Sequence, residues 1–204
     1  MIERKFVKAN MDDRKIKDYL KDKLANSGFS SAEIEKTPLG AKVIIHASKP
    51  GLIVGKGGQH INEISAELNK KFNLDNPQVE INEIRDPELD PNIIADRIVQ
   101  QLIRFGKTRF KAIGYKCLQK MLSSGAVGAE IVMSGRIPGK KHKTWRFKGG
   151  RLPKAGYIAD HLVSKGFREV QWKQGSVGIT VKILSPYVKT PDDFKLTKEK
   201  EGDK

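Results

Sequence analysis

The sequence predicts an α+β fold divided into two domains, and three observations lead to this prediction. Segments in which apolar and polar residues alternate, typical of strands, are interspersed with longer segments whose apolar residues recur every three or four positions, typical of amphipathic helices. Segment 86–91 interrupts both patterns with two prolines and three acidic residues, as a linker does. The charge balance changes at the same place: residues 1–88 hold 15 Lys and Arg against 14 Asp and Glu, and residues 89–204 hold 24 against 10.

These observations divide the chain into five parts. The C-terminal tail holds Lys, Asp and Glu with little apolar material, so we expect it to be disordered. The parts are an N-terminal extension, a first domain, a linker, a second domain and the tail, at residues 1–15, 16–86, 87–91, 92–189 and 190–204.

The first domain has the predicted order helix, strand, strand, helix, helix, strand. Asp12 or Asp13 can cap a helix that runs to about Asn26. Its apolar face follows helical spacing and consists of Ile16, Tyr19, Leu20 and Leu24. The remaining elements are expected as strands at 32–37 and 41–47, a helical turn from Pro50, a helix at 59–72 and a strand at 77–84.

The second domain begins with a helix for which Asp90 is the expected cap and Pro91 the first residue. The apolar side of this helix is expected to consist of Ile94, Ile98, Leu102 and Ile103. After it we expect a helix at 107–123, a strand at 129–133, a basic loop at 134–154, a helix at 157–165 and strands at 168–173 and 177–184.

The positive charge is concentrated in one part of the chain. From Arg97 to Lys154 there are 15 basic residues and one acidic residue, Glu130. Such a one-sided charge destabilises a compact monomer by self-repulsion, and a polyanion such as nucleic acid would relieve it. The alternative is a basic surface that only keeps the protein soluble. Neither a membrane span nor a signal peptide is recognisable, and the single cysteine, Cys117, fits a reducing compartment, so we expect a cytoplasmic protein without a membrane partner.

The stretch LIVGKGGQHI at 52–61 contains a glycine-rich loop. A P-loop needs four residues between its first glycine and its Gly-Lys pair, and a Ser or Thr after the lysine; here three residues separate Gly51 from Gly55, and Gly57 follows the lysine. The dinucleotide fingerprint G-x-G-x-x-G would need a glycine at His60, so neither nucleotide-binding motif fits. The remaining possibilities are a plain turn and the GXXG loop of a KH domain, which holds a nucleic-acid backbone. Small residues at a helix N-terminus let a phosphate approach the main chain, and a lysine adds positive charge. The candidate RNA-binding residues of this loop are Gly55, Lys56, Gly57 and Gly58.

The whole sequence resembles a known family. The element order of the first half, together with IVGKGGQHI, resembles a type II KH domain with a three-stranded sheet. The second half is similar to the C-terminal domain of small-subunit ribosomal protein three. Its matching segments are FKAIGYKCLQKMLSSGAVGAE from Phe110, EIVMSGR from Glu130, WRFKGGRLP from Trp145 and QGSVGITVKI from Gln174. The connecting segment YIADHLVSKGFREVQWKQG resembles the archaeal and eukaryotic branch, and the resemblance covers roughly residues 5–185.

The resemblance implies a structural and functional role. The second domain is expected to pack two helices on a small mixed or antiparallel sheet. Members of the family lie in the head of the small ribosomal subunit, bind its ribosomal RNA, contact neighbouring head proteins and line the channel through which messenger RNA enters. The basic channel residues of the family lie in the helix that matches 110–120, where Lys111 and Lys116 are the nearest matches.

The basic residues around this helix form two stripes at helical spacing. A lysine-rich face of this kind is also compatible with simple solvation. The first stripe is Arg104, Lys107 and Lys111, and the second is Arg109, Lys116 and Lys120.

The basic loop at 134–154 is the second candidate RNA-binding region. Arginine can pair with phosphate, and an aromatic side chain can stack on an unpaired base. We expect Trp145 to be a core residue, its basic neighbours to contact ribosomal RNA, and the loop to become ordered on binding. The basic residues are Arg136, Lys140, Lys141, Lys143, Arg146, Lys148, Arg151 and Lys154.

Signals for catalysis are missing from the sequence. The four histidines have no metal-ligand spacing with one another or with Cys117, and no hydrolase or metalloprotease motif occurs. We therefore expect a binding protein without catalytic residues, metal, cofactor or small-molecule substrate. Two further hypotheses remain: a free-standing KH regulator, which would bind RNA through its first domain alone, and a DNA lyase, which would need a lysine of lowered pKa in a pocket.

Overall fold

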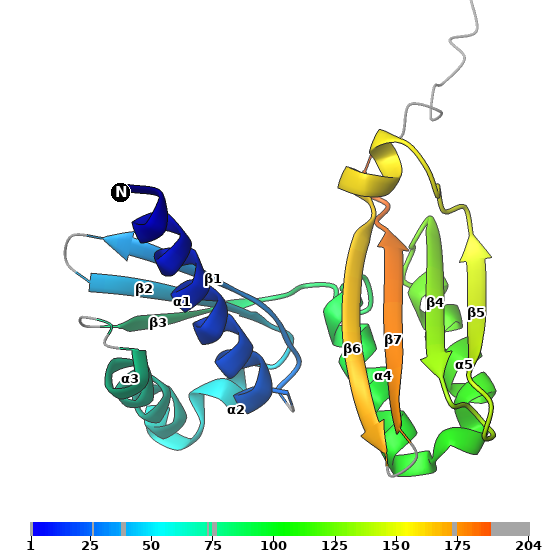
Figure 1. Cartoon of the computed structure of the whole chain (residues 1–204), viewed down its shortest axis with the longest axis horizontal. Helices are drawn as coiled ribbons and strands as arrows, with labels where there is room; N and C mark the ends of the chain where they lie inside the picture. The colour runs from blue at the N-terminus through cyan, green and yellow to red at the C-terminus, as the bar shows by residue number, and fades with distance from the viewer. Residues whose placement is uncertain are drawn as a thin grey trace, which may run out of the picture.

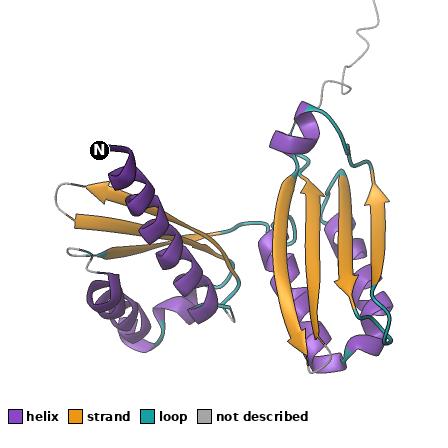
Figure 2. Cartoon of the chain, in the orientation of Figure 1, coloured by secondary structure: helices purple, strands orange, loops and turns teal. Residues whose placement is uncertain are grey.

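The structure, a computed structural model, has an α+β fold, as the sequence predicts (Figures 1 and 2). It describes residues 2–25, 27–37, 40–72, 74, 77–172 and 175–188. A three-stranded sheet belongs to the first half of the chain and a four-stranded sheet to the second half. The tail at 190–204, for which disorder was predicted, lies outside the described residues.

The first domain has the predicted order of elements. In its sheet, of order β1-β2-β3, β1 and β2 are antiparallel while β2 and β3 are parallel. Its elements are α1 (Ile2–Lys23), β1 (Phe29–Thr37), β2 (Gly40–Ala47), α2 (Pro50–Val54), a 3₁₀ turn (Lys56–Gly58), α3 (Gln59–Phe72) and β3 (Gln78–Glu83). The central strand β2 alternates partly buried and buried residues, and Val43 and Ile45 are fully buried beneath the helices.

The start of α1 differs from the prediction. The helix begins at Ile2 rather than after Asp12 or Asp13. No glycine or proline occurs before Gly28, so a possible capping residue alone does not end the helical run. The predicted apolar face is otherwise correct, because Ile16, Leu20 and Leu24 are buried in the core of this domain.

The second domain packs helices on one face of an antiparallel sheet, which confirms the predicted helices-on-sheet architecture. The strand order is β5-β4-β7-β6 (Figure 1). Helix α4 packs on β6 and β7, and α5 packs on β4 and β5. The elements are α4 (Pro91–Phe105), a 3₁₀ turn (Lys107–Arg109), α5 (Phe110–Ser123), β4 (Gly128–Gly135), β5 (Lys143–Gly150), a π-helical turn (Ile158–Leu162), β6 (Ser164–Trp172) and β7 (Gly175–Leu184).

Three predictions for the second domain were wrong in detail. Ile103 is 64% exposed, on the far side of α4 from the buried Ile94 and Ile98. The expected basic loop contains β5, because Trp145 and Phe147 alternate toward the core and β5 pairs with β4 along its whole length. The expected helix at 157–165 is a single turn, since β6 begins at Ser164 and pairs with β7.

The linker region connects the two domains through Asp90. Its Oδ1 accepts hydrogen bonds from the amides of Asn92 (2.9 Å) and Ile93 (3.3 Å), which confirms the predicted cap of α4. Its Oδ2 accepts a hydrogen bond from the hydroxyl of Ser30 on β1 at 2.5 Å. One carboxylate therefore ties the start of the second domain to the sheet of the first.

A buried ion pair fixes α4 to β6. Arg168 donates from two nitrogens to the two carboxylate oxygens of Asp96, and their side chains are only 11% and 15% exposed. Burial raises the pKa of Asp96, although the neighbouring Arg168 opposes this change. The cost of burying this carboxylate is thus offset mainly by its arginine partner.

Candidate nucleic-acid interface

The GXXG loop of the first domain is an open turn at the start of α3. Gly55, Gly57 and Gly58 have φ values of 70°, 62° and 79°, which L side chains rarely adopt. A Cβ at Gly55 would lie 2.3 Å from the His60 ring, whereas a Cβ at Gly57 or Gly58 would meet no atom within 4 Å. Gly57 and Gly58 thus allow the unusual backbone shape of the loop and leave open space before the start of α3.

The charge near this loop is small. Lys56 is exposed and is the one basic residue of the loop, and His60 lies 3.6 Å from the carboxylate of Glu63. Amides at a helix N-terminus favour anions, but one lysine gives little long-range attraction. The geometry therefore fits a local contact with one stretch of backbone rather than a strong electrostatic hold.

Helix α5 is buried on one side and basic on the other. Its inner face consists of Phe110, Ile113, Gly114, Cys117, Leu118 and Met121. Lys111, Lys116 and Lys120 lie on the exposed side. In the part of the chain that the structure describes, none of these three lysines has a carboxylate oxygen within 4.0 Å. Their charge is therefore available to an external anion.

Aromatic residues support one flank of this basic face. The ammonium group of Lys111 lies 4.9 Å from the centre of the Trp145 ring. Trp145 itself donates from Nε1 to the carbonyl of Ile137 at 3.1 Å and packs against the core, as predicted for a core residue. Tyr115, which is 62% exposed, contacts Phe147 edge to face at 5.1 Å. Tyr115 thus adds an exposed aromatic ring to the basic face of α5. The sequence analysis did not include this residue among the candidate site residues.

The two predicted stripes are not both continuous. Gly106, at φ 76°, ends α4, and Lys107 and Arg109 lie on the following 3₁₀ turn. Arg104 is exposed on α4, before this break, so it does not share a helical face with Lys111. The second stripe retains Lys116 and Lys120, one turn apart on α5.

The basic residues of segment 134–154 separate into two groups. Lys140 and Lys141 lie in the exposed connection between β4 and β5, together with Lys143 at the start of β5. Arg146 and Lys148 alternate with the inward Trp145 and Phe147, so they point to the sheet face that α4 and α5 leave uncovered, here called the open face. Arg136 follows β4, and the Arg151 amide donates to the carbonyl of Val127 at 2.9 Å.

Two further lysines lie on the open face. Lys182 on β7 is directly opposite Glu130 on β4, and Lys165 on β6 is directly opposite Lys182. The sequence reasoning did not include Lys165 and Lys182, although their alternation with buried neighbours along the two strands was a usable signal.

Comparison with known proteins assigns both halves of the chain. Residues 15–89 match the KH domain family, and residues 98–183 match the family described as ribosomal protein S3, C-terminal domain. The protein named small ribosomal subunit protein uS3 in Methanocaldococcus jannaschii is 35% identical over 98% of this chain and 96% of its own length. The chain belongs to the ribosomal protein S3 family.

Other archaeal relatives agree with this assignment. The proteins of the same name from Methanosphaera stadtmanae and Methanococcus maripaludis are 38% and 35% identical, over 97% and 96% of this chain and 77% and 92% of their own lengths. These names confirm the resemblance inferred from the sequence motifs. They also describe a ribosomal component rather than an enzyme, so the S3 assignment confirms the expectation of a non-enzymatic protein.

Cys117 is 1% exposed in the core, and burial raises the pKa of its thiol, so it is a packed core residue. Among the described residues, no group of three or more His, Cys, Asp and Glu could hold a metal ion. No described helix is both long and apolar enough to span a bilayer.

Proposed function

We propose that this S3-family protein is a structural component of the small ribosomal subunit head, where it binds small-subunit ribosomal RNA and helps line the channel through which messenger RNA enters. The family membership supports the ribosomal role. The observation that carries the RNA part is the exposed basic face of α5, whose lysines have no acidic partner among the described residues. Neighbouring head proteins are the expected protein partners.

Packing makes α5 suitable for this role. Its inner face is buried against β4 and β5, so the backbone that carries the lysines is held in place before RNA arrives. Each lysine that neutralises a phosphate releases counterions, which gives affinity without reading the base sequence. A channel must accept every messenger sequence, and contacts of this type satisfy that requirement.

The first experiment tests assembly. The full chain and two triple variants are expressed with a tag, and their sedimentation with small subunits is measured on sucrose gradients. The α5 variant is Lys111→Glu with Lys116→Glu and Lys120→Glu, and the matched control is Lys5→Glu with Lys17→Glu and Lys70→Glu, at exposed positions of the first domain. We expect the unmodified chain and the control to sediment with small subunits and the α5 variant to be depleted. If even the unmodified chain is missing from small subunits, the ribosomal role is refuted.

A second experiment separates the two RNA partners. Small subunits that contain the full chain are loaded with messenger RNA carrying photoreactive uridines downstream of the decoding site. We expect crosslinks to peptides that include α5. Normal incorporation without any crosslink to α5 would leave the ribosomal RNA contact standing and overturn the messenger contact.

A further inference from the structure

The open face of the second sheet contains a hollow of about 480 Å³. Its walls come from β4, β5, β7, the start of β6, segment 152–154 and the region of the π-helical turn, which lie close together although they are distant in the sequence. Helices α4 and α5 cover the opposite face of the same sheet, so the hollow is separate from the α5 surface (Figure 1).

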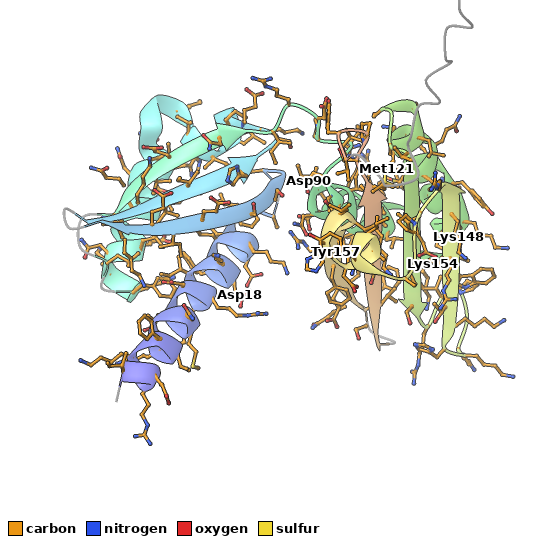
Figure 3. All side chains as sticks on the ribbon, turned by 90° about the horizontal axis from the view of Figure 1, so that it is seen from above. Asp18, Asp90, Met121, Lys148, Lys154 and Tyr157 are labelled. Carbon is orange, nitrogen blue, oxygen red and sulfur yellow. The ribbon has the colours of Figure 1, made fainter. Side chains whose placement is uncertain are left out.

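Cations converge on this hollow. It is lined by four basic residues and two acidic ones: Arg146, Lys154, Lys165, Lys182, Glu130 and Asp160. Lys148 lies beside it on β5, and Figure 3 labels Lys148 and Lys154 on this side of the domain. A concave surface with an excess of one sign of charge concentrates the electrostatic potential more than a flat surface does.

The strand register arranges the charges in one row across the sheet. Glu130 on β4 is directly opposite Lys148 on β5 and Lys182 on β7, and Lys182 is directly opposite Lys165 on β6. Opposite charges at such positions stabilise a sheet, but the like charges of Lys165 and Lys182 destabilise it. Lys165 has a carboxylate partner in Asp160, but this pair is exposed, so it compensates only weakly for the repulsion between the two lysines.

The acidic residues do not neutralise the hollow. Glu130, only 5% exposed, lies 3.4 Å from Lys154 Nζ and 3.9 Å from Lys148 Nζ, and Asp160 lies 3.9 Å from Lys165. The neighbouring Lys154 lowers the pKa of Lys148, because a second positive charge disfavours the protonated form. Within the described part of the chain, Arg146 and Lys182 have no carboxylate oxygen within 4.0 Å.

We propose that this hollow binds a phosphate group, either of an RNA backbone or of a free phosphate compound. Glu130 holds Lys148 and Lys154 in place from below, while Arg146 and Lys182 supply unneutralised charge from both sides. Guanidinium and ammonium groups around one concavity suit the several oxygens of a phosphate. With RNA as the ligand, the second domain would join two RNA segments, one on α5 and one on the open face; this form of the proposal rests on the proposed function.

The test uses the full chain and three soluble probes: inorganic pyrophosphate, a short oligouridylate and an oligoglutamate of similar charge. Binding is followed by NMR of the methyl groups of Val132, Leu152 and Val163, which line the hollow. We expect pyrophosphate to shift these signals saturably. Arg146→Ala with Lys182→Ala should weaken this binding at least about tenfold, since two charge-assisted contacts are lost. The control Lys17→Ala with Lys70→Ala removes the same charge from the first domain and should bind like the unmodified chain.

The three probes separate the possible ligands. If oligouridylate shifts the same signals and competes with pyrophosphate, the phosphate comes from RNA; pyrophosphate binding without such competition supports a free phosphate compound. Tighter binding of oligoglutamate than of either phosphate probe would make the hollow a docking site for an acidic protein and overturn the proposal. Shifts that do not saturate, or that persist in the Arg146 and Lys182 variant, would overturn it as well. Each of these outcomes leaves the sedimentation result for the α5 variant unaffected, so the two proposals can fail separately.

Discussion

The two domains offer nucleic acid very different surfaces. The first domain is nearly neutral and presents one lysine, Lys56, on a loop whose glycines fix an unusual backbone shape. The second domain carries the positive charge of the chain on two opposite faces, α5 and the open face. The first surface suits recognition by shape at short range, and the second suits attraction at long range. In the proposed complex, the second domain would therefore supply most of the attraction for RNA. The glycine loop would shape one local contact with the RNA backbone.

The largest expected effect is on the stability of the second domain, whose sheet and helices separate the two basic faces. Arg168→Leu leaves the buried carboxylate of Asp96 without its partner, and we expect the free energy of unfolding to fall by about 3–5 kcal/mol. The pKa of Asp96, already raised by burial, should rise further in this variant. Protonation then removes the unpaired charge, so the loss should become smaller as the pH falls from 7 toward the folded-state pKa of Asp96.

Chemical denaturation at several pH values measures this effect. The control is the double variant Arg168→Leu with Asp96→Asn, in which no charge is left buried and most of the stability should return. A loss that is independent of pH, and equal in the single and double variants, would show that packing around Arg168 matters rather than the ion pair.

The next effect concerns the affinity of the second domain for RNA. Replacing Lys111, Lys116 and Lys120 by alanine should weaken binding of single-stranded RNA about tenfold to a hundredfold, since each exposed contact contributes up to about 1 kcal/mol. The slope of log affinity against log salt should become shallower by about 2, because three phosphate contacts are lost. Filter binding at several salt concentrations measures both quantities. An unchanged slope would mean that these lysines do not contact phosphates.

The sequence predicted the parts of the fold that depend on local patterns. The cap at Asp90 and the helix at Gln59–Phe72 follow from spacing and capping, and both are present in the structure. Strand β5 was missed, because its lysines and arginine dominate the composition and conceal the alternation of Trp145 and Phe147. The composition of this segment is typical of a loop, but its pairing with β4 makes it a strand.

The candidate site was predictable in a similar, partial way. The glycine loop and the basic face of α5 are each contiguous in the sequence, so a motif or a helical period reveals them. The hollow brings together Arg146, Lys165 and Lys182 from three strands; alternation along each strand marks the exposed side chains, but only the register brings them side by side. No local pattern contains that register, because it depends on long-range pairing.

A smaller effect is expected at the glycine loop. Gly57→Asp with Gly58→Asp places anions where a backbone phosphate would lie, and we expect RNA affinity to fall about tenfold or less, since one local contact is disturbed. The control is Gly57→Asn with Gly58→Asn, which imposes a similar cost at positive φ without adding charge, because Asn and Asp both tolerate this conformation. Fluorescence anisotropy with labelled RNA compares the two variants. Equal affinities would show that the loop does not contact a phosphate, and the first domain would then contribute shape alone.

The smallest expected effect is on the buried carboxylate of the open face. Glu130→Gln keeps the size of the side chain and removes the negative charge beneath Lys148 and Lys154, so the crowded lysines repel each other with less compensation. We expect the free energy of unfolding to fall by about 1 kcal/mol in low salt, a modest loss because the lysines themselves are half exposed and screened by water. Pyrophosphate should restore stability to the variant more than to the unmodified chain, since a ligand that binds only the folded state stabilises it. Thermal unfolding with and without pyrophosphate measures this difference. If pyrophosphate stabilises both chains equally, the carboxylate of Glu130 does not affect anion binding in the hollow. The basic face of α5 would then be the remaining difference between the two domains in their attraction for anions.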